Sequence, residues 1–233
     1  MNLEIIKEEK DYLVVMKPAG MVVHVGDGGK HDGETLVDEV REYLADDFED
    51  MTRPGIVHRL DKDTSGVMVV ARNQAALEHF VEQFKQRKVK KAYSTLVRGV
   101  LEHEEAVIDS PIARSTGDRK KMGLAAESVG KEAVTRYKVV EAMEGASLLR
   151  VQIETGRTHQ IRVHMQAIGH PVIGDKVYGD RQVNARFLKL FGLKRQFLHA
   201  AELCFVDPAG EKVEIKTDLP GDLFEVLERF YNY

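Results

Sequence analysis

The chain has 233 residues, of which 43% are hydrophobic and 31% are charged, a composition typical of a globular protein rather than a disordered one. Its single cysteine excludes an intrachain disulfide and a zinc site made of cysteines. No apolar stretch approaches the ~20 residues that cross a bilayer, and the N-terminus lacks the basic start and apolar block of a signal peptide. The sequence therefore predicts a cytoplasmic protein.

The formal net charge is −4, which weighs against a nucleic-acid partner because such proteins usually carry an excess of basic residues. The charges are segregated, however, and their distribution matters more than their sum. Residues 34–50 are strongly acidic, whereas residues 85–98 and 181–198 are basic and contain no acid. Two interpretations stay open. The two basic segments could form one basic surface suited to a polyanion, or each could be the solvated face of a separate helix.

Apolar periodicity predicts a mixed set of elements along the chain. Strands are expected at 3–7, 12–17, 66–72, 92–100, 132–141, 147–154, 196–207 and 212–216. Helices are expected behind Thr35, over 76–84, over 158–168 with Thr158 as its cap, and over 222–230. The glycine-rich segment 25–34 and the polar segment 114–130 are expected to be loops.

The strands outnumber the helices and do not alternate with them strictly, so a doubly wound parallel sheet is not expected. The pattern favours an α+β fold with a largely antiparallel mixed sheet flanked by helices and loops. No change in composition, proline-rich linker or internal repeat divides the chain. We therefore expect one catalytic domain over residues 1–233.

The stretch RPGIVHRLDKDTSG at 53–66 places polar residues on a loop that enters the apolar strand expected next. Asp61 stands beside Lys62 and follows His58 and Arg59. An aspartate beside fixed cations keeps its charge and its geometry, which suits a nucleophile or a base. The alternative is a loop carboxylate that caps backbone amides.

A second polar stretch, ETGRTHQIRVH at 154–164, covers the change from an expected strand to an expected helix. Arg157 and the helix N-terminus together favour an anion. Arg162 lies on a different helix face from the apolar stripe, which consists of Ile161, Met165 and Ile168. The alternative for Arg162 is a surface salt bridge.

A third stretch, KKAY at 90–93, opens an expected strand. A tyrosine there can stack on a base while the neighbouring lysines meet phosphate. The alternative is that Tyr93 is an ordinary packing residue.

Taken in this order, HRLDKDTSG, KKAY and TGRTHQIRVHMQAIGHPVIGDKVYG resemble the motifs of the RluA family of pseudouridine synthases. KPAGMVVHVG at 17–26 is similar to that family's first motif, and FLHAAELCF to its last core strand. The resemblance extends from about residue 5 to about residue 220. It implies the pseudouridine synthase fold with a central active-site cleft, and an enzyme that isomerises specific uridines in structured RNA, either rRNA or tRNA.

Carried over motif by motif, the resemblance makes Asp61 the catalytic carboxylate, Tyr93 the aromatic ring on the flipped-out uracil, and Arg162 the partner that holds Asp61. It implies that neither a cofactor nor a metal is required. Three routes stay open, in which the carboxylate adds to the uracil ring, attacks the sugar carbon, or removes a sugar proton.

Further residues are expected to bind the substrate. They are His58, Arg59, Ile161, Lys88, Lys90 and Lys91, with Lys85 as an additional candidate for phosphate. Many members of the family carry a small RNA-binding domain of the S4 type before the first motif. Here that motif begins at residue 17, so we expect recognition to depend on the catalytic unit itself, which favours a compact stem-loop or tRNA over a large particle. We also expect a monomer.

Two alternatives compete with this interpretation. One is a catalytically inactive RNA-binding protein or RNA chaperone of the same fold, which a single-turnover assay would separate from the enzyme. The other is a metal-dependent hydrolase built on His58, Asp61, Asp63 and His159, which requires activity that a chelator removes. His159 and His164 are five residues apart and point to different helix faces, so we do not expect them to share a metal.

Overall fold

The computed structural model describes residues 3–24, 33–115, 117–118 and 121–233. The chain divides into two compact units, of which unit 1 comprises Met1–Lys90 and Glu202–Thr217, and unit 2 comprises Lys91–Ala201 and Asp218–Tyr233. The boundary falls within strand β10 (Leu198–Val206), which contributes residues to both units. Most of the loop expected at 25–34 lies outside the described residues.

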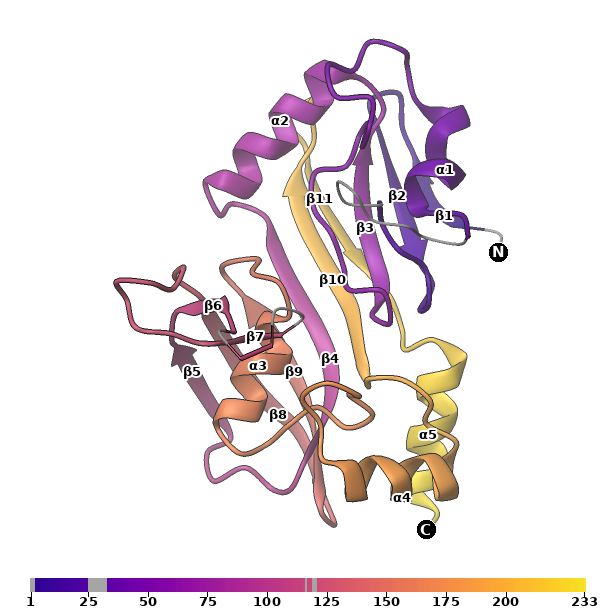
Figure 1. Cartoon of the computed structure of the whole chain (residues 1–233). Coiled ribbons are helices and arrows are strands. Elements are labelled where there is room, and N and C mark those ends of the chain that lie inside the picture. Colours follow the sequence, from indigo (N-terminus) through magenta and orange to yellow (C-terminus); the bar gives the residue numbers. More distant parts are fainter. Residues whose placement is uncertain (1–2, 25–32, 116, 119–120) are drawn as a thin grey trace. The chain divides into compact units, whose positions relative to one another are not determined.

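Unit 1 contains strands in the order β1-β2-β3-β10, with β11 paired to β10 (Figure 1). The pairs β1–β2, β2–β3 and β10–β11 are antiparallel. The strand bounds are Glu4–Glu8 for β1, Tyr12–Lys17 for β2, Ser65–Ala71 for β3 and Lys212–Lys216 for β11. Strand β3 is buried along its whole length, as expected of a near-continuous apolar run.

The helices of unit 1 are α1 (Leu36–Val40), the 3-10 turn η1 (Arg41–Tyr43) and α2 (Gln74–Lys85). Thr35 and Asp38 form a capping box at α1, which confirms the predicted helix start. Asn73 caps α2 by accepting a hydrogen bond from the backbone of Ala76 at 2.9 Å.

The core of unit 1 is centred on three aromatic rings that meet edge to face. The ring centroids of Tyr12, Phe80 and Phe205 are 5.4–5.8 Å apart, within the range that favours such aromatic packing. These rings come from β2, α2 and β10, so they join the helix to the sheet.

Unit 2 contains the strand order β10-β4-β9-β8-β5, together with the separate two-stranded hairpin β6–β7. The pairs β4–β9, β8–β9, β5–β8 and β6–β7 are antiparallel. The strand bounds are Lys90–Arg98 for β4, Glu105–Asp109 for β5, Ile112–Arg114 for β6, Met122–Leu124 for β7, Val134–Met143 for β8 and Ala146–Ile153 for β9.

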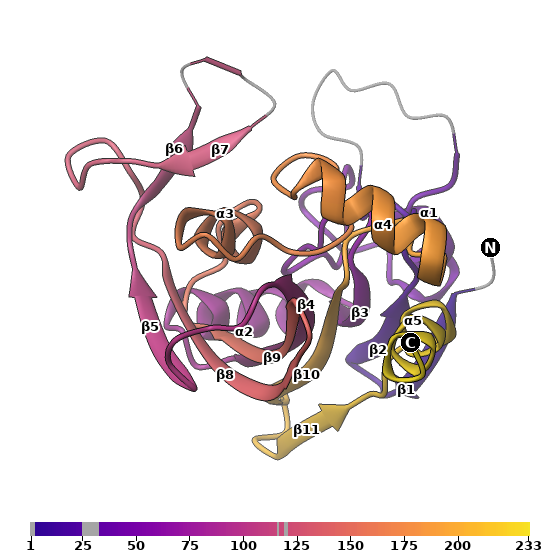
Figure 2. The same cartoon turned by 90° about the horizontal axis from the view of Figure 1, so that it is seen from below.

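Three helices complete unit 2, namely α3 (Gln160–Ala167), α4 (Arg181–Phe191) and α5 (Gly221–Tyr231). Figure 2 shows α3 between the β6–β7 hairpin and the β8–β9 strands. Helices α4 and α5 pack through the rings of Phe187, Phe191 and Phe230, whose centroids are 5.0–5.2 Å apart. Asp180 caps the start of α4, and Gly192 ends it in the left-handed conformation.

The predicted α+β class with a largely antiparallel sheet is confirmed, whereas several local predictions are wrong. Thr158 does not cap α3, because the helix begins after His159, whose backbone is left-handed and gives no side-chain cap. Ile168 does not belong to a buried stripe, since it is 38% exposed. The sequence interpretation also left out β5, and it assigned a loop where β7 forms. Among the described helices, none is long and apolar enough to span a membrane.

Candidate active site

Asp61 lies in unit 1 on the turn that leads into β3. The backbone of this turn is held by hydrogen bonds, since Thr64 donates to the Asp61 carbonyl at 3.1 Å and Gly20 donates to the Lys62 carbonyl at 2.8 Å. Asp61 itself is half-buried, whereas Lys62 is exposed. The polar loop at the strand entrance is therefore a well-anchored turn, as its position before a buried strand predicts.

Lys17 is a residue that the sequence interpretation did not single out. Its side chain is fully buried, and its ammonium group donates to the carbonyls of Pro18 at 2.7 Å, Met21 at 2.9 Å and Lys62 at 3.1 Å. A buried ammonium is stable only where its N–H groups find acceptors. Lys17 thus joins the segment after β2 to the backbone of the turn that carries Asp61.

His58 and Arg59, on the same loop, have different surroundings. The His58 Nε2 accepts the backbone N–H of Val69 at 3.1 Å, which requires a neutral ring with its proton on Nδ1. The ring also stacks on Phe84 with centroids 4.8 Å apart. His58 therefore fastens the loop to β3 and α2 inside unit 1, while Arg59 is exposed. Their expected contacts with RNA stay predictions.

Tyr93 lies in unit 2 on β4, opposite Val151 of β9, and is 7% exposed. Lys91 is two residues earlier on the same strand, so its side chain leaves the same face. Burial lowers the pKa of Lys91 to about 8, whereas Lys88 and Lys90 are exposed. The three lysines that the sequence grouped together therefore differ in their exposure to solvent.

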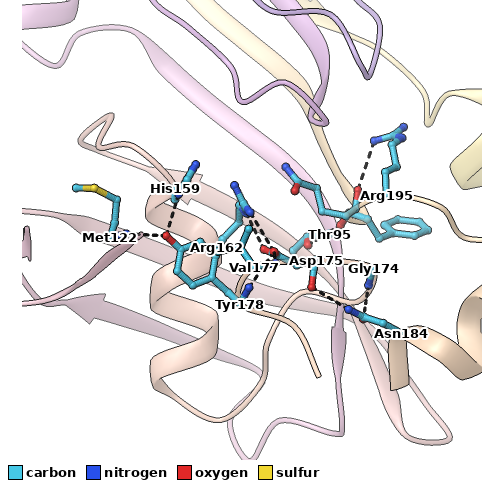
Figure 3. Close-up of polar contacts among 12 residues, drawn as sticks. Thr95, Met122, His159, Arg162, Gly174, Asp175, Val177, Tyr178, Asn184 and Arg195 are labelled. Atoms are coloured by element: carbon cyan, nitrogen blue, oxygen red, sulfur yellow. Dashed lines mark hydrogen bonds and ion pairs between the residues drawn. The ribbon is translucent and has the colours of Figure 1, made fainter. Parts of the chain in front are cut away.

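Arg162 lies on α3 and forms a buried ion pair rather than the surface salt bridge considered above. Its Nε donates to Asp175 Oδ2 at 2.6 Å and its Nη2 donates to Asp175 Oδ1 at 3.0 Å (Figure 3). The side chains are 6% and 0% exposed. The guanidinium carbon also lies 5.0 Å from the centroid of the Tyr178 ring, a cation–π distance. The plane of the guanidinium is thus fixed from two sides.

Asp175 is in turn held by the backbone of its own loop. Its Oδ1 accepts the N–H groups of Val177 at 2.8 Å and Tyr178 at 3.0 Å. Burial raises the pKa of Asp175, but the hydrogen bonds and charge of Arg162, together with these N–H groups, outweigh burial and lower it. Asp175 is therefore a carboxylate at neutral pH.

Asn184 on α4 fixes the position of this loop from outside. Its Oδ1 accepts the N–H of Gly174 at 2.7 Å, and its Nδ2 donates to the carbonyl of Asp175 at 2.8 Å. Gly174 has a φ of +81°, and an added Cβ would lie 2.0 Å from the carbonyl oxygen of Arg195. The Gly174–Asp175 backbone accordingly has little freedom to move.

The entrance to α3 is organised by Gln160 instead of Thr158. The Gln160 Oε1 accepts hydrogen bonds from the Arg157 N–H at 3.0 Å and the Thr155 hydroxyl at 2.7 Å, and its Nε2 donates to the Val134 carbonyl at 2.9 Å. The buried Gln160 side chain thus ties the residues that precede α3 to the start of β8. Ile161, the predicted pocket residue, is 4% exposed.

The described residues contain no group of three or more His, Cys, Asp or Glu side chains arranged to hold a metal ion. His159 Nδ1 hydrogen-bonds the Tyr178 hydroxyl at 2.8 Å. His164 is buried, and its ring nitrogens meet the Thr135 hydroxyl and the Ser110 carbonyl, each at 2.9 Å. Both histidines are therefore engaged in internal hydrogen bonds of unit 2.

Comparison with known proteins identifies the class to which this arrangement belongs. The family profile described as RNA pseudouridylate synthase matches residues 11–167. An uncharacterized RNA pseudouridine synthase of Bacillus subtilis, YlyB, is 43% identical over 98% of this chain and 73% of its own length. Ribosomal large subunit pseudouridine synthase D of Zymomonas mobilis is 41% identical over 97% of this chain and 73% of its own length.

A solved structure supports the same conclusion. Human RNA pseudouridylate synthase domain containing 1 has a TM-score of 0.74 and 32% identity, and the match covers 94% of this chain and 84% of the human one. The chain therefore belongs to the RluA family of RNA pseudouridine synthases and isomerises uridine in RNA to pseudouridine. The resemblance inferred from its motifs is confirmed.

We predict that Lys17→Met lowers the free energy of unfolding by roughly 1–3 kcal/mol, because buried carbonyl oxygens lose their donor while the side-chain volume is kept. Urea denaturation followed by circular dichroism measures this change. Lys62→Met is the matched control, since Lys62 is exposed and its replacement should change stability by less than about 0.5 kcal/mol. Equal stability of the two variants would contradict a stabilising role for the Lys17 ammonium.

We predict that Asp175→Asn lowers the free energy of unfolding by roughly 3–5 kcal/mol at pH 7, because Arg162 is left as a buried charge without its carboxylate. Asp175 has a lowered pKa in the folded protein, so the stability that it contributes is present above the unfolded pKa. The difference from wild type should therefore shrink as the pH falls below about 4.

Glu154→Gln is the control for Asp175→Asn, because Glu154 pairs with Arg136 in an exposed ion pair with side chains 40% and 51% exposed. Its loss should cost at most about 1 kcal/mol. Thermal unfolding of both variants at several pH values separates the two cases. A cost for Asp175→Asn no larger than that of the control would show that the buried pair contributes nothing net.

Proposed function

We propose that Asp61, Tyr93 and Arg162 form the active site of this enzyme. The observation that carries the proposal is that all three residues lie inside the segment 11–167 that matches the family, each within a motif that the sequence shares with it. Asp61 is assigned the catalytic carboxylate, Tyr93 the ring on which the uracil stacks, and Arg162 the cation that orients Asp61.

The rigidity of Arg162 supports its assigned role. Its bonds to Asp175 use Nε and Nη2, so the guanidinium that the proposal assigns to Asp61 has a fixed plane. A lone ion pair at about 4 Å in an effective dielectric near 20 amounts to roughly 4 kcal/mol before desolvation, and the charge of Asp175 makes the attraction between Arg162 and Asp61 weaker than that. A guanidinium that is already fixed loses little conformational entropy when it holds a second carboxylate.

The reaction exchanges one bond at the sugar for another. The bond between the sugar carbon C1′ and N1 of uracil breaks, and a bond between C1′ and C5 forms. The proton on C5 is released, and N1 takes up a proton. A uridine in folded RNA must first leave the base stack at a cost of a few kcal/mol, and stacking on Tyr93 could return about 1–3 kcal/mol. Asp61 supplies the carboxylate that each of the three open routes requires.

Structured RNA is the proposed substrate, with ribosomal RNA of the large subunit as the first candidate and tRNA as the second. The relative from Zymomonas mobilis is named for the large ribosomal subunit, which supports this order. The exposed Lys85, Lys88 and Lys90, with exposed Arg59, are proposed to meet phosphates. We further propose that the enzyme acts as a cytoplasmic monomer without a metal or cofactor.

We predict that Asp61→Asn lowers turnover by at least roughly 10³-fold without loss of folding, because the amide is neither a nucleophile nor a base. Tritium release from 5-tritiated uridine RNA measures turnover, with large-subunit rRNA and tRNA transcripts as parallel substrates. Asp63→Asn is the matched control on the same turn. Appreciable tritium release by Asp61→Asn would refute the assignment of Asp61. If the wild-type enzyme released tritium from the tRNA transcript alone, the proposed order of the two substrates would be reversed.

We predict that Tyr93→Ala lowers the catalytic rate by roughly 10- to 100-fold, because the flipped-out uracil loses stacking worth about 1–3 kcal/mol. RNA affinity should change little, because phosphate contacts dominate affinity. Single-turnover rates and filter binding give the two quantities. Tyr137→Ala is the control, since Tyr137 is equally buried at 7% exposure and also lies opposite Val151. Equal losses in rate and affinity would contradict the placement of Tyr93.

A further inference from the structure

Tyr178 contacts several elements of unit 2, and no role has been assigned to it above. It is 5% exposed, and its ring lies against the guanidinium of Arg162 at 5.0 Å. Its backbone N–H donates at 3.0 Å to the same Asp175 oxygen that accepts from Arg162 Nη2. Tyr178 therefore constrains Arg162 by two separate routes, one through its ring and one through Asp175.

The hydroxyl at the other end of Tyr178 faces two further elements (Figure 3). It accepts the backbone N–H of Met122 in β7 at 2.8 Å, and it hydrogen-bonds His159 Nδ1 at 2.8 Å. A phenol has one proton and two acceptor positions, so both bonds can form at once. His159 is the residue at the left-handed entrance to α3, with a φ of 58°.

The β6–β7 hairpin rests on this end of Tyr178. Ile112 of β6 is 1% exposed and packs in one cluster with Ala133, Val163 and Tyr178, with Met122 partly buried against it. Val163 follows Arg162 directly on α3. The hairpin thus meets Tyr178 in two ways, through a small apolar cluster that also contains Val163 of α3 and through the hydrogen bond from the Met122 N–H to the Tyr178 hydroxyl.

We propose that Tyr178 is a positioning residue that transmits the placement of the β6–β7 hairpin to Arg162. When the hairpin is docked, its hydrogen bond fixes the Tyr178 hydroxyl, and this fixes the Tyr178 ring and the loop that carries Asp175. The ring and Asp175 then hold the Arg162 guanidinium in the orientation that the proposed site requires. This inference rests on the proposed role of Arg162 in holding the catalytic carboxylate. It assigns the hairpin a part in turnover that is separate from any part in RNA affinity.

Tyr178→Phe tests the proposal, because it removes the two hydroxyl bonds and keeps the ring beside Arg162. At saturating RNA the catalytic constant should fall roughly 10-fold, within the range by which coupled residues change rates. The dissociation constant for RNA should stay within about twofold of wild type. His159→Asn, in which the new residue tolerates a left-handed backbone, should lower the catalytic constant in the same direction.

A double-mutant cycle tests whether the hairpin acts through the hydroxyl. Ile112→Ala loosens the hairpin and should lower the catalytic constant when Tyr178 is present, but much less when it is combined with Tyr178→Phe. Ile112→Val is the milder variant if the alanine substitution unfolds the protein. Leu124→Ala on β7 is the control, since Leu124 is 49% exposed. Independent, multiplicative losses in the cycle would overturn the proposed route.

A readout without RNA separates this inference from the proposed active site. Hydrogen exchange of the Arg162 Nε–H, followed by nitrogen-15 NMR, should be faster in Tyr178→Phe than in wild type and unchanged in Leu124→Ala. If the Asp61→Asn variant remains active, the proposed site fails, yet the exchange rates still test the positioning of Arg162. If wild type and Tyr178→Phe share the same catalytic constant and exchange rate, the positioning role is wrong.

Discussion

The buried ion pair between Arg162 and Asp175 is the interaction on which the candidate site in unit 2 depends. Its charges lie almost entirely out of water, and such a pair is stable only where its geometry is good and its remaining hydrogen-bonding groups are satisfied. Two N–H groups of the 174–179 loop meet the carboxylate, and the Tyr178 ring meets the guanidinium. The ion pair and the conformation of this loop therefore stabilise each other, and α4 stabilises the loop further through Asn184.

Unit 1 fixes the turn that carries Asp61 by a different use of a cation. Lys17 bonds three backbone carbonyls, which suits an ammonium because its three donors rotate freely around one point charge. Arg162 bonds one carboxylate through two parallel N–H groups, which suits a planar guanidinium. The ammonium restrains a backbone, whereas the guanidinium presents a side chain in a fixed plane. Each unit thus contains a buried cation in a rigid setting, Lys17 at the turn that carries Asp61 and Arg162 on α3.

Features of the fold that depend on a few neighbouring residues could be predicted from the sequence, whereas features that depend on tertiary contacts could not. The strands at 12–17 and 212–216 were predicted to the residue, because an apolar run marks the first and an alternation of apolar and charged residues marks the second. The capping box at Thr35 was likewise local. By contrast, Thr158 seemed a suitable cap until Gln160, a buried glutamine with partners on β8, proved to organise that turn. Nothing in the spacing of GDKVYG indicates that Asp175 pairs with Arg162, since several other acids are equally compatible with the sequence alone.

The pairing of Arg162 with Asp175 also bears on how the isomerase can use a cation. A lone buried guanidinium would attract a nearby carboxylate with its full charge, and strong attraction stabilises the ground state of a nucleophile as well as its transition state. A guanidinium whose charge is balanced by Asp175 attracts a second carboxylate less strongly, while its geometry stays fixed. If Asp61 is the carboxylate that Arg162 meets, Asp175 thus lets the enzyme orient Asp61 without holding it too tightly to react. The energetic contribution of Arg162 is then mainly one of orientation, which is the contribution that a pre-organised site supplies most effectively.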